Sequence, residues 1–113
     1  MHLPIETVAE AVEQLESGGA WWAVSRSGCV GVMQICPRWA DVPRNHLLIP
    51  EINRREGIRL LRYWHNKAHG DWWATLAGYR CGWSGLRGKC GHRYAGAVIR
   101  LARKLQKQHK EGT

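Results

Sequence analysis

The sequence has no phenylalanine, and it has no acidic residue anywhere between Trp72 and Lys110. It also lacks any apolar run approaching the roughly 20 residues that a membrane-spanning helix requires, so we expect no membrane span. The N-terminal stretch MHLPIETVAEAVEQ has neither the basic start nor the apolar centre of a signal peptide. If the protein is exported, the sequence therefore predicts either a leader that has been removed or another route.

The four cysteines lack the C-x-x-C spacing of zinc ribbons and of redox motifs. We therefore predict no metal site and no cofactor. An even number of cysteines permits two disulfides in more than one connectivity, and the short glycine-rich loop from Cys81 to Cys90 is suited to one of them. Four free thiols are an equally good interpretation, so the pairing of Cys29 and Cys36 stays open at this point.

Charge is distributed unevenly along the chain, whose net charge is +8. Up to Asp71 the basic and acidic residues balance at eight each, whereas the segment from Trp72 to Lys110 holds nine basic residues. Such a basic half is either a solubilising surface or a site for a polyanion, meaning nucleic acid, an anionic membrane surface or an anionic cell wall. The sequence contains no DNA- or RNA-recognition motif, so we do not expect nucleic acid to be the partner.

Length and hydrophobic periodicity predict a single, mostly α-helical domain over residues 1–113. The glycine, serine and β-branched residues at 23–35 favour an irregular loop, or at most a minor β-hairpin. Asp71 is a suitable helix N-cap, and the last helix has a basic outer face. The expected helices cover 5–16, a short helix that Pro37 opens and Pro43 closes, 50 to about 70, 72 to about 79, and about 92–109. We expect at least half of four tryptophans to be buried in the core: Trp21, Trp22, Trp72 and Trp73.

Glu16 is the only acidic residue between Leu15 and Pro37, and it falls in the last turn of the first predicted helix. The negative end of the helix dipole and burial against Trp21 or Trp22 would both raise the pKa of its carboxyl group. Glycosidic bond cleavage needs a carboxyl group that stays protonated near neutral pH, because the leaving oxygen must receive a proton. The alternative is a solvated glutamate at a helix end.

Several short motifs that include or follow Glu16 occur in the order found in a known family. They are ES at 16–17, AVS at 23–25, GVMQ at 31–34, INRREG at 52–57, LAGYRCG at 76–82 and YAGAV at 94–98. From about Ile5 to Val98 the chain thus resembles the soluble lytic transglycosylases and the related goose-type lysozymes. The resemblance implies a lysozyme-like fold and an enzyme that cleaves the glycan strands of peptidoglycan.

The same resemblance implies a catalytic group and its nearest partners. Glu16 would act first as general acid and then as base, and Tyr94 would orient it or form a hydrogen bond with it. Ser25 and Gln34 would contact the sugar near the cleavage point. Tyr79 would line the cleft.

Further matching positions imply supporting roles. Met33 would wall the cleft, and Ser17 would secure the end of the first helix. Gly31 would let the backbone approach a sugar closely, because glycine has no Cβ. Two residues depart from the family pattern: Arg80 stands where an asparagine is usual, and Cys36 where a methionine often lies.

The acidic residues favour a mechanism with one carboxylate. Most glycosidases use two, but only Asp41 is a credible second group here. In the mechanism that the resemblance implies, the muramic C6 hydroxyl closes onto C1 and leaves 1,6-anhydro ends. The alternatives are a lysozyme-like muramidase that uses Glu16 with water and, more distantly, a nucleic-acid-binding module built on the basic C-terminal helix. We expect a monomer acting on peptidoglycan in the periplasm or cell wall, phage-encoded and released at lysis or carried in a virion.

Overall fold

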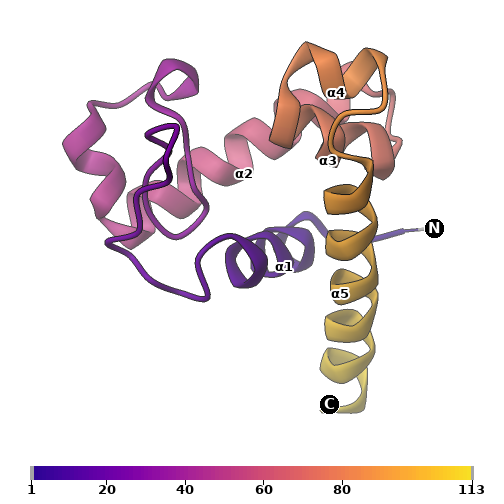
Figure 1. Cartoon of the computed structure of the whole chain (residues 1–113). Helices are drawn as coiled ribbons and strands as arrows, with labels where there is room; N and C mark the ends of the chain where they lie inside the picture. Colours follow the sequence, from indigo (N-terminus) through magenta and orange to yellow (C-terminus); the bar gives the residue numbers. More distant parts are fainter. Residues whose placement is uncertain (1, 113) are drawn as a thin grey trace.

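The computed structural model describes residues 2–112, and this part of the chain contains five α-helices (Figure 1). They are α1 (Ile5–Glu16), α2 (Pro50–Lys67), α3 (Trp72–Cys81), α4 (Trp83–Arg87) and α5 (His92–Glu111), with the 3₁₀ turns η1 (Pro37–Trp39) and η2 (Arg44–Leu48) before α2. Within the described range, β structure is limited to two isolated antiparallel bridges, Val24 with Val30 and Val30 with Ile35. The predicted mostly α fold is confirmed. None of the described helices is both long and apolar enough to cross a bilayer.

The core forms where α1, α2, α3 and α5 pack against one another. α1 packs against α5 and α2, and α3 packs against α2, α4 and α5. Each helix contributes side chains with no solvent exposure, such as Val12 of α1, Leu61 of α2, Leu76 of α3 and Val98 of α5. Burying each of these side chains contributes roughly 1.5–3 kcal/mol. Figure 1 shows α2 beginning at a loop-rich end of the molecule, where the segment between α1 and α2 folds, and running from there to the helical core.

The segment between Cys81 and Cys90, expected to be a loop, contains the helix α4. Its Gly85 lies against α3 so closely that a Cβ would collide with the backbone carbonyl of Ala77. The glycine that gives this segment the composition of a loop therefore serves a close helix-to-helix contact. α3 begins as predicted, with Asp71 accepting a hydrogen bond from the Trp73 amide at 2.9 Å.

The prediction for the tryptophans was wrong, because only Trp72 of the four is buried. It is 7% exposed and packs on the ring of His65, with 4.4 Å between ring centroids. Trp73 follows it on α3, where neighbouring positions point in different directions, and is 45% exposed. Trp21 and Trp22 lie on turns rather than on a helix and are 49% and 63% exposed.

Candidate active site

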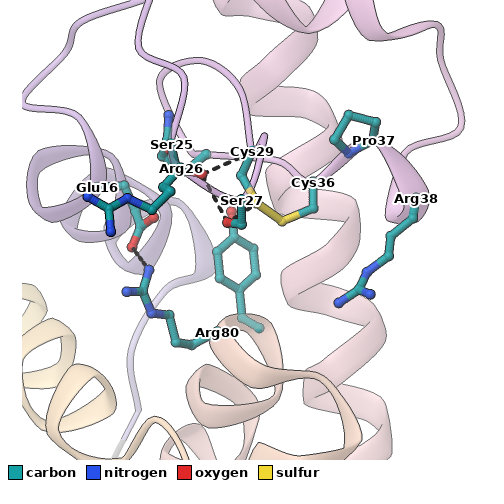
Figure 2. Close-up of a pocket in the computed structure, with 11 residues that line it drawn as sticks. Glu16, Ser25, Arg26, Ser27, Cys29, Cys36, Pro37, Arg38 and Arg80 are labelled. Carbon is teal, nitrogen blue, oxygen red and sulfur yellow. Dashed lines mark hydrogen bonds and ion pairs between the residues drawn. A yellow bond between two sulfur atoms is a disulfide. The ribbon is translucent and has the colours of Figure 1, made fainter.

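A cleft of about 730 Å³ opens where α1 ends, between the loop that follows it and the end of α3 (Figure 2). It brings together residues far apart in sequence, since Glu16 and Arg80 both line it. Four residues predicted for the site lie in its wall: Glu16, Ser25, Gln34 and Tyr79. The wall is completed by Arg26, Ser27, Cys29, Cys36, Pro37, Arg38 and Arg80.

Glu16 is the last residue of α1, and its side chain is only 10% exposed. Burial raises the pKa of its carboxyl group above the ordinary value. The Arg80 guanidinium, whose Nη1 lies 3.3 Å from Glu16 Oε1, and the Tyr94 hydroxyl act in the opposite direction but do not cancel this rise. Trp21 and Trp22, expected to bury the carboxyl group, are not among the described residues that line the cleft.

Tyr94 contacts Arg80 but is not among the described residues of the cleft wall. The Arg80 guanidinium lies over the Tyr94 ring, 5.4 Å from the ring centroid. Its hydroxyl oxygen is buried, and no group in residues 2–112 forms a hydrogen bond of ordinary geometry with it. The Tyr94 hydroxyl and the Glu16 carboxyl group are close enough to shift each other's pKa, and the orienting role expected of Tyr94 stays a prediction.

The loop beside Glu16 is held in place by Asn53, a fully buried residue of α2. Its Nδ2 donates to the carbonyls of Val30 and Leu47 at 2.7 and 2.8 Å, and its Oδ1 accepts from the Met33 amide at 2.8 Å. One amide side chain thus bonds to three backbone groups, two in the loop and one in η2. The motif placed Asn53 in the family pattern, but the sequence did not show which segments it would join.

Gly31 and Met33 occupy positions different from those expected. A Cβ on Gly31 would collide with the Asn53 side chain and the Leu47 carbonyl, so its small size serves packing against α2 rather than an approach to sugar. Met33 is fully buried, and its sulfur would collide with a Cβ on Gly57. Its side chain therefore belongs to the core and not to the cleft wall, which corrects the sequence prediction.

Comparison with known protein families identifies the family of this chain. A family model described as the transglycosylase SLT domain matches residues 5–99, which is most of the chain. The chain belongs to the SLT family. Membership supports a lytic transglycosylase type of activity on peptidoglycan. A search of curated proteins finds no significant match.

Two further polar residues of this SLT domain, Ser17 and Gln34, fix the loop through backbone atoms. Ser17 donates to the Val32 carbonyl at 2.7 Å, which ties the end of α1 to the loop. Gln34 has a φ of 53°, and its Nε2 donates to the carbonyls of Ala23 and Gly31, both at 3.0 Å. Because both hydrogens of this nitrogen are used, only Oε1 remains for a ligand.

Ser25 and Tyr79 present groups to the cleft and are themselves held in place. The Ser25 Oγ accepts from the Cys29 amide at 3.0 Å and lies 3.1 Å from the Ser27 Oγ. The Tyr79 hydroxyl donates to the Met33 carbonyl at 2.9 Å, which links the two walls of the cleft. Burial raises the pKa of Tyr79 well above its ordinary value, so the hydroxyl remains a hydrogen-bond donor.

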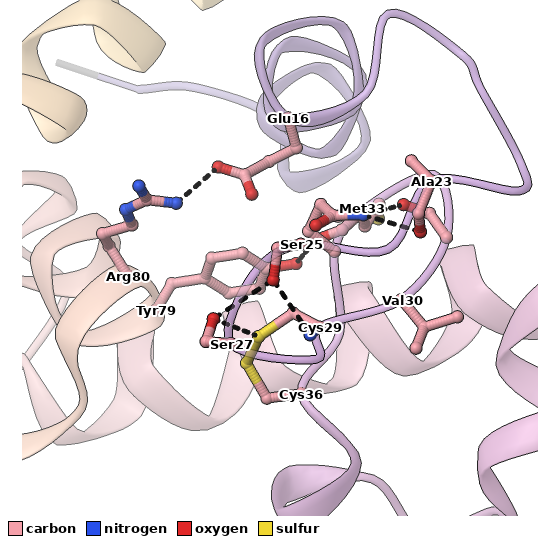
Figure 3. Close-up of a disulfide and its surroundings, with 12 residues drawn as sticks. Glu16, Ala23, Ser25, Ser27, Cys29, Val30, Met33, Cys36, Tyr79 and Arg80 are labelled. Atoms are coloured by element: carbon pink, nitrogen blue, oxygen red, sulfur yellow. Dashed lines mark hydrogen bonds and ion pairs between the residues drawn. A yellow bond between two sulfur atoms is a disulfide. The ribbon is translucent and has the colours of Figure 1, made fainter.

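Both cysteine pairs of the SLT domain form disulfides, Cys29–Cys36 and Cys81–Cys90. The first lines the cleft and closes the turn that carries Gln34, and Figure 3 shows Ser27 beside the Cys29 sulfur. The second closes the segment that holds α4, directly after Arg80. Cys36, which stands where the family often has methionine, thus has a structural role, because its sulfur is part of a disulfide in the cleft wall.

Asp41, the second carboxylate considered from the sequence, does not line the cleft. Its side chain is 73% exposed, and its Oδ2 lies 3.3 Å from the Arg59 Nε. Glu16 is therefore the one carboxylate among the described residues of the cleft wall. Within residues 2–112 no three His, Cys, Asp or Glu side chains come together as metal ligands do.

Proposed function

We propose that this SLT domain cleaves the glycosidic bond between N-acetylmuramic acid and N-acetylglucosamine in peptidoglycan and leaves 1,6-anhydromuramoyl ends. Glu16 acts first as the acid and then as the base. The observation that carries the proposal is a single, largely buried carboxyl group in a cleft that no other described carboxylate lines.

The first step is proton transfer from Glu16 to the bridging oxygen as the glycosidic bond breaks. The raised pKa of Glu16 supports this step, because it keeps a larger share of the enzyme protonated. Once the proton has left, the Arg80 guanidinium at 3.3 Å stabilises the carboxylate that remains.

In the second step the Glu16 carboxylate takes the proton of the muramic C6 hydroxyl, and the C6 oxygen bonds to C1. The substrate's own acetamido group takes the place of a second enzyme carboxylate by stabilising C1 between the two steps. The C6 oxygen is tethered to the reacting ring, so its effective concentration greatly exceeds that of a free nucleophile. No water is consumed.

The remaining cleft residues position the sugar. Gln34 Oε1 accepts a hydrogen bond from a sugar hydroxyl, since its nitrogen is already used by the loop. The Ser25 hydroxyl contacts the sugar near the cleavage point, and the Tyr79 ring forms part of the wall. The two disulfides support action outside the reducing cytosol, in the periplasm or the cell wall.

The test is mass spectrometry of the fragments released from purified peptidoglycan. We expect products one water lighter than those of a hydrolase, with muramoyl ends that borohydride does not reduce. A folded Glu16→Gln variant serves as the control and should release almost nothing. Predominantly reducible ends from the unchanged enzyme would reject the transglycosylase reaction and establish a muramidase that uses the same Glu16.

A further inference from the structure

The cleft carries more positive charge than the proposed chemistry requires. Its wall holds three arginines, Arg26, Arg38 and Arg80, against the single carboxylate of Glu16. Arg80 is paired with that carboxylate. Within residues 2–112, neither Arg26 nor Arg38 has a carboxylate within salt-bridge distance.

The two unpaired arginines lie on different sides of the cleft. Figure 2 shows Arg26 on the Glu16 side of the Cys29–Cys36 disulfide and Arg38 on the opposite side. Both are exposed, and the Arg38 guanidinium is supported by the Trp39 ring at 5.7 Å from the centroid. A guanidinium presents a planar pair of N–H donors that matches a carboxylate.

We propose that Arg26 and Arg38 form an anion-binding subsite that recognises carboxylates borne by the muramic acid residues of the glycan strand. The proposal rests on the proposed function and adds the substrate feature that the enzyme selects. A muramic acid residue offers a carboxylate from one of two sources. The lactyl group supplies it on strands without peptides, and the stem supplies it on strands that carry peptides.

Charge is what separates such strands from neutral glycans. Neutral sugar hydroxyls are recognised by groups such as Ser25 and Gln34 and do not require a guanidinium. An excess of positive charge in a cleft concentrates an anionic polymer and weakens as salt increases. Because both arginines are exposed, the ion pair between each of them and a substrate carboxylate has the modest strength of a surface ion pair. We expect the two ion pairs together to change KM about fivefold.

The experiment compares strands before and after their carboxylates are converted to neutral methylamides by carbodiimide coupling. One substrate is soluble glycan freed of peptides by an amidase, and the other carries uncross-linked stems whose amino groups have first been acetylated. We expect amidation to raise the KM of the unchanged enzyme about fivefold at low salt on at least one substrate. Which substrate responds identifies the lactyl group or the stem as the source.

The decisive variant is Arg26→Gln/Arg38→Gln, which should no longer distinguish amidated from unmodified strands. A matched control is Arg62→Gln/Arg93→Gln, which removes two exposed arginines outside this cleft and should keep the full discrimination. Circular dichroism checks that both variants fold.

Two results would overturn the subsite. One is equal cleavage of amidated and unmodified strands by the unchanged enzyme, and the other is full discrimination retained by Arg26→Gln/Arg38→Gln. Neither touches the proposed function, whose own failure would appear as predominantly reducible muramoyl ends or as no cleavage of any strand by the unchanged enzyme.

Discussion

Two glutamates in this protein have side chains of similar solvent exposure yet opposite pKa shifts. The side chain of Glu16 is 10% exposed, and that of Glu56 on α2 is 6% exposed. Each has an arginine partner, Arg80 for Glu16 and Arg59 for Glu56. Burial pushes the pKa of both carboxyl groups upwards, but the net pKa is raised for Glu16 and lowered for Glu56.

Stronger desolvation of the Glu16 carboxyl group and a larger number of hydrogen-bond donors around Glu56 together explain the difference. Glu56 accepts from the Asp41 amide at 2.7 Å and from the Arg59 Nη2 and Nε at 3.2 and 3.3 Å. Together these donors outweigh burial and hold Glu56 as a carboxylate. Glu16 has one ion-pair contact, at 3.3 Å, and burial prevails. An arginine neighbour alone therefore does not make a carboxylate structural, and an incompletely satisfied one stays available for proton transfer.

The largest expected effect separates the two residues by activity. Glu16→Gln should lower the rate on peptidoglycan roughly 100-fold or more, because the amide keeps the shape but has no proton to transfer. Rates of glycan release by purified, folded variants measure this. Near-normal activity of folded Glu16→Gln would reject the catalytic role.

Glu56→Gln should instead lower stability, because it removes the charge that Arg59 and the Asp41 amide satisfy. We expect a loss of about 1–3 kcal/mol in the free energy of unfolding. Thermal melts should show a fall of several degrees at neutral pH. A melting temperature equal to that of the unchanged protein would contradict the structural role.

The pH dependence of these melts sharpens the contrast. The lowered pKa of Glu56 contributes stability above the pKa of the unfolded carboxyl group, and this is lost as pH falls through the folded pKa. The raised pKa of Glu16 has the opposite effect on stability. Its stabilising contribution is present at low pH and is lost as pH rises through the folded pKa. The difference in melting temperature between Glu56→Gln and the unchanged protein should therefore shrink in acid. The melting temperature of Glu16→Gln should equal or exceed that of the unchanged protein at neutral pH.

A smaller effect concerns Arg80, which holds down the pKa of Glu16. Arg80→Gln removes this influence, while the Tyr94 hydroxyl and Tyr79 stay in place. Because the acid must be protonated to act, the alkaline limb of the kcat/KM profile should move to higher pH. High salt should move the limb of the unchanged enzyme in the same direction and leave that of Arg80→Gln in place. An unmoved limb in Arg80→Gln would show that another group controls it.

The smallest effect is expected for Asp41→Asn. Its exposed ion pair with Arg59 contributes at most about 1 kcal/mol, and the amide of residue 41 can still donate to Glu56. Activity should stay within about twofold of the unchanged enzyme, which initial rates on soluble strands will measure. A loss as deep as that of Glu16→Gln would indicate a mechanism with two carboxylates.

Periodicity predicted the parts of the fold that repeat. Val8 and Val12 recur at helical spacing and are fully buried, and Asp71 caps the helix that follows it. The same reasoning missed α4, because the role of Gly85 depends on the α3 backbone at Ala77 and not on its own neighbours.

The candidate site was predicted only in part, because an irregular loop has no period that tells which way a side chain points. The motifs placed Glu16 and Gln34 where the structure finds a cleft, but they did not show that Met33 faces the core. Arg26 and Arg38 gave no signal at all. They line the same cleft in the folded loop between them, which contains the Cys29–Cys36 crosslink.

The anchoring of that loop has a consequence for how the protein can change. The side chains of Ser17, Gln34, Asn53 and Tyr79 fasten the loop by its main-chain atoms, among them the carbonyls of Val30 and Val32 and the amide of Met33. A main-chain atom is present whatever residue occupies the position. The outward-facing positions between these anchors, such as residues 26 and 27, are therefore open to substitution while the loop keeps its path. Libraries randomised there would vary the sugars and substituents that the cleft accepts without rebuilding the scaffold, and selection in nature has the same freedom.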